Sequence, residues 1–127
     1  MQGEALVGSL AAIRIFCDDL EAARDFYNVT LRLTETTSTP EWVSDDLGAA
    51  DLVVDWARPD DDESDDLIGR LTGLSFRVDD AEAVCAELAA AGVEIVGQPE
   101  RQPWGGTLAH IADPSANVLT LVQYPPS

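Results

Sequence analysis

Short runs of alternating apolar and polar residues cover most of this chain, and two helix-like segments interrupt them. Residues 10–17 alternate and predict a first strand. Asp18 or Asp19 can cap the helix that follows, which we expect to run to about residue 29 with Glu21 in its first turn. Three more strands are predicted in this half, over residues 31–37, 42–47 and 50–56.

The second half of the chain has the same order of elements. A strand over residues 71–78 precedes Asp79 and Asp80, either of which can cap a helix that runs to Ala91 and stops at Gly92. Further strands are predicted over residues 93–96, 107–112 and 118–123, with a turn-rich connection over 99–106 and a tight turn over 113–117. Each half is therefore predicted to fold as β-α-β-β-β.

The two halves are also related in sequence. The segment IRIFCDDLEAA, which begins at Ile13, returns 61 residues later as LSFRVDDAEAV, which begins at Leu74. Four residues are identical at this constant offset, namely Asp18 and Asp79, Asp19 and Asp80, Glu21 and Glu82, and Ala22 and Ala83. A duplicated strand-and-helix unit predicts a pseudo-symmetric fold with a shared site between the halves.

The composition fits one compact domain of 127 residues, or two small halves that share a core. We expect a first module at about residues 8–57, an acidic linker at 58–69 and a second module at 70–124. The linker carboxylates lack the alternating ligands and the central glycine of a calcium loop, so we interpret them as a solvated segment.

Nothing in the sequence predicts a secretory signal or a membrane segment. The N-terminal residues have no basic region ahead of an apolar one, and no apolar stretch is long enough to span a bilayer. Cys17 and Cys85 occupy non-equivalent places in the repeat, which suggests buried thiols rather than a disulfide. We therefore expect a cytoplasmic protein.

The charge balance restricts the partners. With 24 acidic residues against 7 arginines and no lysine, the formal net charge is −17. Such a surface repels nucleic acid and anionic membranes, so neither is expected as a partner. It would attract a cationic ligand by long-range steering, although we favour the interpretation that the charge serves solubility alone.

Several segments resemble one known family. Residues 19–27, DLEAARDFY, are similar to the first-helix signature of the vicinal oxygen chelate superfamily, the group of glyoxalase I, the bleomycin-resistance proteins, the fosfomycin-resistance enzymes and the extradiol dioxygenases. Further similarities lie in FRVDD (76–80), AAGVE (90–94), PWG (103–105) and DPSANVLTL (113–121). The resemblance implies an α+β fold of two tandem βαβββ modules, whose curled mixed sheet surrounds a concave cavity with the helices outside.

The resemblance also implies where a metal would be bound. Enzymes of this family hold a divalent metal at four equivalent positions, usually as His, Glu, His and Glu, and these positions fall on Ala12, Asp51, Gly73 and Thr120. Ala and Gly offer no side-chain ligand, and an Asp with a Thr is too few for tight binding of zinc, iron or nickel. The chain has a single histidine, so a shift of register cannot restore two. We expect the metal site to be lost and no cofactor to be bound.

Strand alternation indicates which residues face the cavity instead. Together with the Trp104 loop at the cavity mouth, it predicts a mixed lining of apolar and polar side chains. The predicted ligand-binding residues are Arg14, Phe16, Asp51, Val53, Asp55, Ser75, Arg77, Trp104, Leu108, His110, Val118 and Thr120.

Two tryptophans and two arginines carry specific expectations. Trp104 could stack on a planar ligand, whereas Trp56 is expected to point at the core by strand parity. Arg14 and Arg77 could pair with Asp51 and Asp55 inside the cleft, since buried charges need partners.

His110 has two interpretations. It could be a general base oriented by Asp51 or Asp55, because an unperturbed imidazole titrates near neutrality. It could instead be a polar wall residue that hydrogen-bonds a ligand or water, since the pattern places no nucleophile or paired acid beside it.

The functional hypotheses follow from these features. The first is a metal-free binding protein that sequesters an antibiotic, or another aromatic or cationic small molecule, in clefts at the interface of a homodimer. The alternative is a divergent glyoxalase-like lyase or isomerase, or a dioxygenase-related enzyme, that uses His110 without the metal. A metal-dependent glyoxalase or dioxygenase would require ligands that the pattern lacks. A subunit that binds a protein partner is the remaining alternative.

Overall fold

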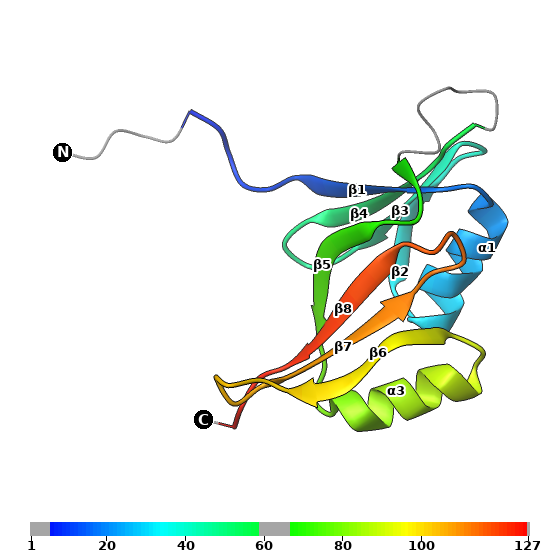
Figure 1. Cartoon of the computed structure of the whole chain (residues 1–127). Coiled ribbons are helices and arrows are strands. Elements are labelled where there is room, and N and C mark those ends of the chain that lie inside the picture. Colours follow the sequence, from blue (N-terminus) through cyan, green and yellow to red (C-terminus); the bar gives the residue numbers. More distant parts are fainter. Residues whose placement is uncertain (1–5, 59–66, 127) are drawn as a thin grey trace.

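The computed structural model describes residues 6–58 and 67–126, which form two βαβββ modules, each with its own four-stranded mixed sheet (Figure 1). The first module comprises β1 (Ala12–Cys17), α1 (Leu20–Arg24), the π-helix η1 (Asp25–Thr30), β2 (Thr34–Ser38), β3 (Trp42–Asp46) and β4 (Asp51–Trp56). Its strand order is β1-β4-β3-β2, with β1 parallel to β4.

The second module repeats this topology with β5 (Leu71–Arg77), α3 (Ala81–Ala90), β6 (Glu94–Arg101), β7 (Thr107–Ala112) and β8 (Val118–Gln123). Its strand order is β5-β8-β7-β6, with β5 parallel to β8. The expected α+β fold of two tandem modules is therefore confirmed. Residues 59–66, most of the predicted acidic linker, lie outside the described residues.

The repeated Asp pair starts both helices in the same way. Asp19 accepts a hydrogen bond from the Ala22 amide at 3.1 Å, and Asp80 accepts one from the Ala83 amide at 3.1 Å. Each carboxylate satisfies an amide that the first helical turn leaves without a partner. The second Asp of each pair is therefore the cap.

Three elements differ from the sequence-based expectation. The first helix becomes a π-helix after Arg24, and the Leu31 amide bonds to the Phe26 carbonyl at 2.8 Å. Strand β2 begins at Thr34 rather than at Leu31, because Leu31 packs against the core. Strand β6 extends through Pro99 to Arg101; its position at the sheet edge and its irregular pairing with β7 tolerate a residue that has no amide hydrogen.

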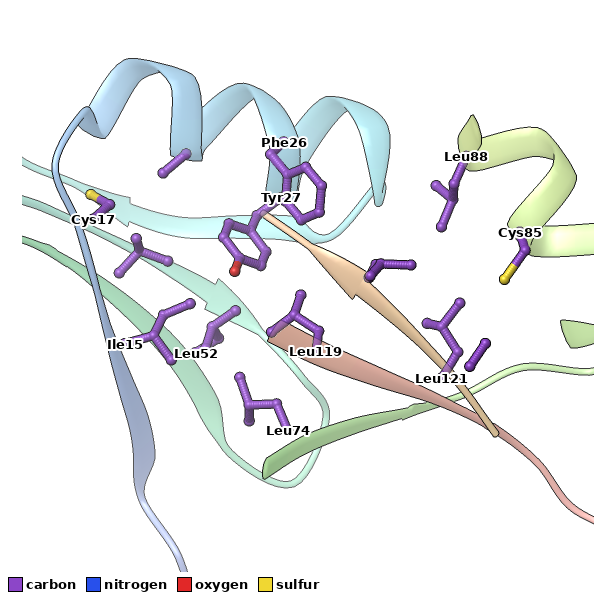
Figure 2. Close-up of a cluster of buried hydrophobic side chains, with 14 residues drawn as sticks. Ile15, Cys17, Phe26, Tyr27, Leu52, Leu74, Cys85, Leu88, Leu119 and Leu121 are labelled. Carbon is purple, nitrogen blue, oxygen red and sulfur yellow. The ribbon is translucent and has the colours of Figure 1, made fainter. Parts of the chain in front are cut away.

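One hydrophobic core joins the two modules. Figure 2 shows Ile15 and Leu52 of the first sheet beside Leu74 and Leu119 of the second, with Phe26 above them on the first helix. Because both sheets contribute one face to this core, their opposite faces are left for ligand or solvent. No helix in the described ranges is long and apolar enough to cross a membrane.

The cysteines and Trp56 give opposite outcomes. Cys17 and Cys85 are free and buried, as expected. Burial, followed by the nearby Asp113 carboxylate, raises the pKa of the Cys17 thiol to about 12, so it packs as a small apolar group. Trp56 keeps the expected inward parity of β4, but it is not buried in the core. Trp56 ends β4 at the rim of the sheet, is 37% exposed, and donates from Nε1 to the Asp18 carbonyl at 3.3 Å.

A hydrogen-bond network centred on Asp113 connects the modules. The Tyr27 hydroxyl donates to Asp113 Oδ2 at 2.7 Å, and Ser115 Oγ donates to Asp18 Oδ1 at 2.7 Å. Asn117 Nδ2 donates to the carbonyl of Phe16 at 2.7 Å. The turn between β7 and β8 thus binds the first helix and the end of β1, which fixes the two sheets relative to each other.

We expect Tyr27→Phe to lower the free energy of unfolding by about 1.5–3 kcal/mol, because it removes a buried hydrogen bond to a charged group. Urea denaturation at pH 7 measures the loss. Tyr124→Phe, at a half-exposed tyrosine, is the matched control and should leave stability nearly unchanged. Equal stability of the two variants would mean that the Tyr27–Asp113 bond does not hold the modules together.

A second buried carboxyl, Asp45 on β3, has an incomplete hydrogen-bond environment. Asn28 Nδ2 donates to Asp45 Oδ1 at 2.6 Å, whereas Asp45 Oδ2 and Asn28 Oδ1 are buried without partners among the described residues. Burial raises the pKa of Asp45 above its ordinary value; the Asn28 hydrogen bond and Arg24 act in the opposite direction, and Glu35 adds to the rise. A proton on Oδ2 would supply the donor that Asn28 Oδ1 lacks.

The pKa of Asp45 is higher in the folded state than in the unfolded state. Its contribution to stability is therefore complete at pH values below the unfolded-state pKa, and it is lost as the pH rises through the folded-state pKa. We expect Asp45→Asn to remove this pH dependence and to raise stability at pH 7 by about 1 kcal/mol, since the new amide can pair with Asn28. Urea denaturation of both proteins from pH 4 to pH 8 tests this. A variant that is less stable than wild type at pH 7 would contradict it.

Candidate functional site

The predicted ligand-binding residues lie mainly on two open sheet faces, opposite the faces that form the core. We define the N-terminal face as the outward positions of β1, β4 and β3, which are Ala12, Arg14, Phe16, Asp51, Val53, Asp55, Trp42, Ser44 and Asp46. We define the C-terminal face as the outward positions of β5, β8 and β7, which are Gly73, Ser75, Arg77, Val118, Thr120, Val122, Leu108, His110 and Ala112. Strand parity correctly assigned the predicted strand residues to these faces.

On the N-terminal face, Arg14 and Asp55 form an ion pair. Arg14 Nη2 and Nε lie 2.7 and 2.8 Å from Asp55 Oδ2, and the guanidinium also lies 5.5 Å from the centroid of the Phe16 ring. A shallow hollow of about 280 Å³ is lined by Arg14, Asp55, Trp42 and Val53. The pairing of Arg14 was expected, but Trp42 was missing from the predicted site residues although its place opposite Asp55 follows from strand pairing.

On the C-terminal face, His110 is held by Thr120. His110 Nδ1 and Thr120 Oγ1 lie 3.0 Å apart, and Thr120 is only 8% exposed. The imidazole packs against Gly97 of β6, where a Cβ atom would approach the ring to 2.9 Å. Glycine at position 97 therefore permits the close contact that fixes the ring.

Aromatic side chains border the C-terminal face. Trp104 is 51% exposed, and its ring centroid lies 6.0 Å from that of Tyr124. Its inner side rests on Gly106, where a Cβ atom would come within 2.0 Å of the indole. Tyr124 in turn lies 4.7 Å from the guanidinium of Arg77. Trp104 thus presents an open aromatic surface, as the sequence suggested, and Tyr124 is a neighbour that the pattern did not identify.

Two expected contacts of this face are wrong. Within one subunit, Arg77 does not pair with Asp51 or Asp55, because those carboxylates belong to the other sheet, and it stacks on Tyr124 instead. His110 is not oriented by either aspartate for the same reason, and its partner is the Thr120 hydroxyl. A carboxylate–histidine pair for general base catalysis is therefore absent at His110 in the described part of the chain.

The positions of the family metal ligands do not fit a metal ion. Ala12 pairs with Asp51 on the first sheet, and Gly73 and Thr120 lie on the second, where Thr120 is bound to His110. Gly73 has a φ of +80° within a register shift of β5, a conformation that histidine or glutamate would adopt only with strain. In residues 6–58 and 67–126, no three His, Cys, Asp or Glu side chains gather closely enough to share a metal.

Comparison with known proteins decides the family. The model of the glyoxalase/bleomycin resistance protein/dioxygenase superfamily matches residues 9–121. The chain belongs to this superfamily. A search of curated proteins finds no match.

Solved structures give the same fold. TnmS3, an antibiotic binding protein from Streptomyces sp. CB03234, is 28% identical over 98% of this chain and 100% of its own, with a TM-score of 0.77. A glyoxalase/bleomycin resistance protein from the same strain is 31% identical over 91% of this chain and 100% of its own, with a TM-score of 0.67. A superfamily member from Sphaerobacter thermophilus DSM 20745 is 25% identical over 94% of this chain and 100% of its own, with a TM-score of 0.76.

The contact between Gly106 and Trp104 yields a third prediction. Gly106→Ala should displace the indole, because the new Cβ overlaps the ring, and should shift the Trp104 side-chain signal in an NMR spectrum. Gly8→Ala adds the same methyl group where nothing lies within 4 Å, and should leave that signal in place. An unchanged Trp104 signal in Gly106→Ala would show that the indole does not rest on Gly106.

Proposed function

We propose that this protein is a metal-free binding protein that sequesters an aromatic small molecule, an antibiotic with a basic group being the best fit, without converting it. The observation that carries the proposal is the exposed Trp104 ring beside a sheet face on which the two family ligand positions are a glycine, Gly73, and a threonine bound to His110, Thr120. The similarity of this chain to TnmS3, an antibiotic binding protein, supports the same assignment.

The two faces suggest how the ligand is enclosed. Each face belongs to a separate sheet, and the hollow on the N-terminal face is shallow. Small-molecule sites usually bury most of the ligand, so neither face alone makes a complete site. In a two-fold homodimer, the N-terminal face of one subunit can meet the C-terminal face of the other, which would produce two equivalent clefts.

The charge distribution suggests which end of the ligand each face holds. Asp46 and Asp51 of the N-terminal face make no ion pair with any described arginine, whereas Asp55 is neutralised by Arg14. A basic group on the ligand would therefore be held near Asp51, and the aromatic part would lie against Trp104. A planar, basic aromatic compound meets both requirements.

Binding of 9-aminoacridine, a planar basic probe, tests the proposal. We expect saturable quenching of tryptophan fluorescence with one probe per subunit, and recovery of the probe unchanged after incubation. Trp104→Ala should weaken binding by about tenfold or more, because stacking on the indole is lost. Trp56→Ala, at the rim of the other sheet, is the matched control and should bind as wild type does.

Two results would contradict the proposal. The first is an absence of saturable binding by 9-aminoacridine together with an absence of saturable binding by anthracene-2-carboxylate and its neutral carboxamide. The second is conversion of the probe to a product whose formation His110→Ala abolishes, which would favour the enzyme hypothesis.

A further inference from the structure

The two faces differ in charge. On the N-terminal face, Asp46, Asp51 and Asp55 accompany a single arginine that is already bound to one of them. On the C-terminal face, the aligned positions hold no carboxylate; one row consists of Ser75, Thr120 and His110, and the next of Arg77, Val122 and Leu108. The C-terminal face therefore combines polar and cationic side chains with apolar ones, and it lacks the carboxylates of the N-terminal face.

Arg77 is the cationic group of this face. Its guanidinium carbon lies 4.7 Å from the centroid of the Tyr124 ring, and within residues 6–58 and 67–126 it makes no ion pair with a carboxylate. A guanidinium stacked on a ring keeps its in-plane N–H groups available at its edge. Tyr124 thus positions Arg77 without neutralising its charge.

His110 adds a second donor. Thr120 is nearly buried, and in the described residues its hydroxyl has no hydrogen-bond partner besides His110 Nδ1. If Nδ1 carried the proton, the hydroxyl hydrogen would be left without an acceptor, which is costly in a buried site. The tautomer in which the hydroxyl donates to Nδ1 satisfies both groups, and in this tautomer the imidazole carries its proton on Nε2.

The Nε2 atom is free to reach a ligand. It makes no hydrogen bond with a described residue, and it is not among the buried polar atoms that lack a partner, so it is not fully enclosed. The Cα atoms of His110 and Arg77 are two strand spacings and two residues apart, roughly 12 Å. Their side chains, with a carboxylate between them, can span this distance.

The nearest aligned carboxylate is too far away to occupy these donors. Glu100 pairs with Leu108, which places it in the row of Arg77, but on the edge strand β6. Three strand spacings, about 14 Å, separate β6 from β5. Figure 1 shows β5 and β6 at the two sides of the second sheet.

We propose that Arg77 and the Nε2–H group of His110 bind an anionic oxygen, a carboxylate or an acidic phenol, carried by the ring system that stacks on Trp104. This inference rests on the proposed function and narrows the ligand class to an aromatic compound with an acidic group at this end. A basic group at the opposite end would meet the carboxylates of the N-terminal face, so the complete ligand is zwitterionic.

The negative net charge does not exclude such a ligand. Exposed charges more than about 8 Å apart are largely screened at physiological ionic strength. At contact distance, the guanidinium and the imidazole N–H act directly on the bound oxygen, and hydrogen bonds to charged groups are the stronger class. Local donors therefore decide which group binds on this face.

A matched pair of probes tests the inference. Anthracene-2-carboxylate and its neutral carboxamide have the same ring system, and quenching of tryptophan fluorescence gives a Kd for each. We expect wild type to prefer the carboxylate by roughly tenfold or more. Arg77→Gln should reduce this preference to about threefold or less, mainly by weakening binding of the carboxylate.

The control variant is Arg70→Gln, which makes the same change of charge just before β5 begins. It lies seven residues from Arg77, about 23 Å along an extended chain, and should keep the wild-type preference. Equal binding of carboxylate and carboxamide by wild type, or an unchanged preference in Arg77→Gln, would overturn this inference while the proposed function stands. A lack of saturable binding by both anthracene probes and by 9-aminoacridine would overturn both.

Discussion

Asp113, buried in the turn between β7 and β8, receives hydrogen bonds from the Tyr27 hydroxyl and from the Ser115 and Asn117 amides. The amides come from its own turn, whereas Tyr27 comes from the first helix. If the modules separated, Asp113 would lose the hydrogen bond from Tyr27. A buried carboxylate that loses a donor is left with an uncompensated desolvation cost. The relative placement of the two sheets, and hence of their open faces, depends on this group.

That placement separates the chemistry of the two faces. The N-terminal face holds carboxylates and one neutralised arginine, whereas the C-terminal face holds an unneutralised arginine, an oriented histidine and an exposed tryptophan. Family members that act as enzymes need a metal to stabilise developing charge. Ala12 and Gly73, which offer no side-chain ligand, stand at two of the positions where the family resemblance places metal ligands.

Local sequence signals predicted a large part of this arrangement. The repeated Asp pairs identified both helix starts, because an aspartate before an apolar-periodic run has a specific hydrogen-bonding role. Alternation in β1, β4, β7 and β8 assigned residues to faces, because the side-chain period of a strand is two. The expected loss of the metal site rests on the family resemblance, which places two ligand positions on Ala12 and Gly73, and on the repeat, which relates these two positions.

Features that depend on tertiary packing were beyond the sequence. The π-helical turn arises where the first helix meets the core, and the register shift at Gly73 arises from pairing between distant strands. Alternation places Arg77 on a face but does not say which sheet opposes it, so its expected aspartate partner was wrong and Tyr124 was missed. Trp56 followed the inward parity of β4, yet at the end of the strand no core remains to cover it.

Native mass spectrometry of the purified protein, with and without added zinc, nickel or iron, tests the central claim most directly. It reports the number of subunits and any bound mass in a single measurement. The predicted result is a dimer that takes up no metal under any of these conditions, with or without an organic molecule bound in each cleft. A monomer, or one metal ion bound per subunit, would contradict the account, the first by removing the shared cleft and the second by restoring metal chemistry.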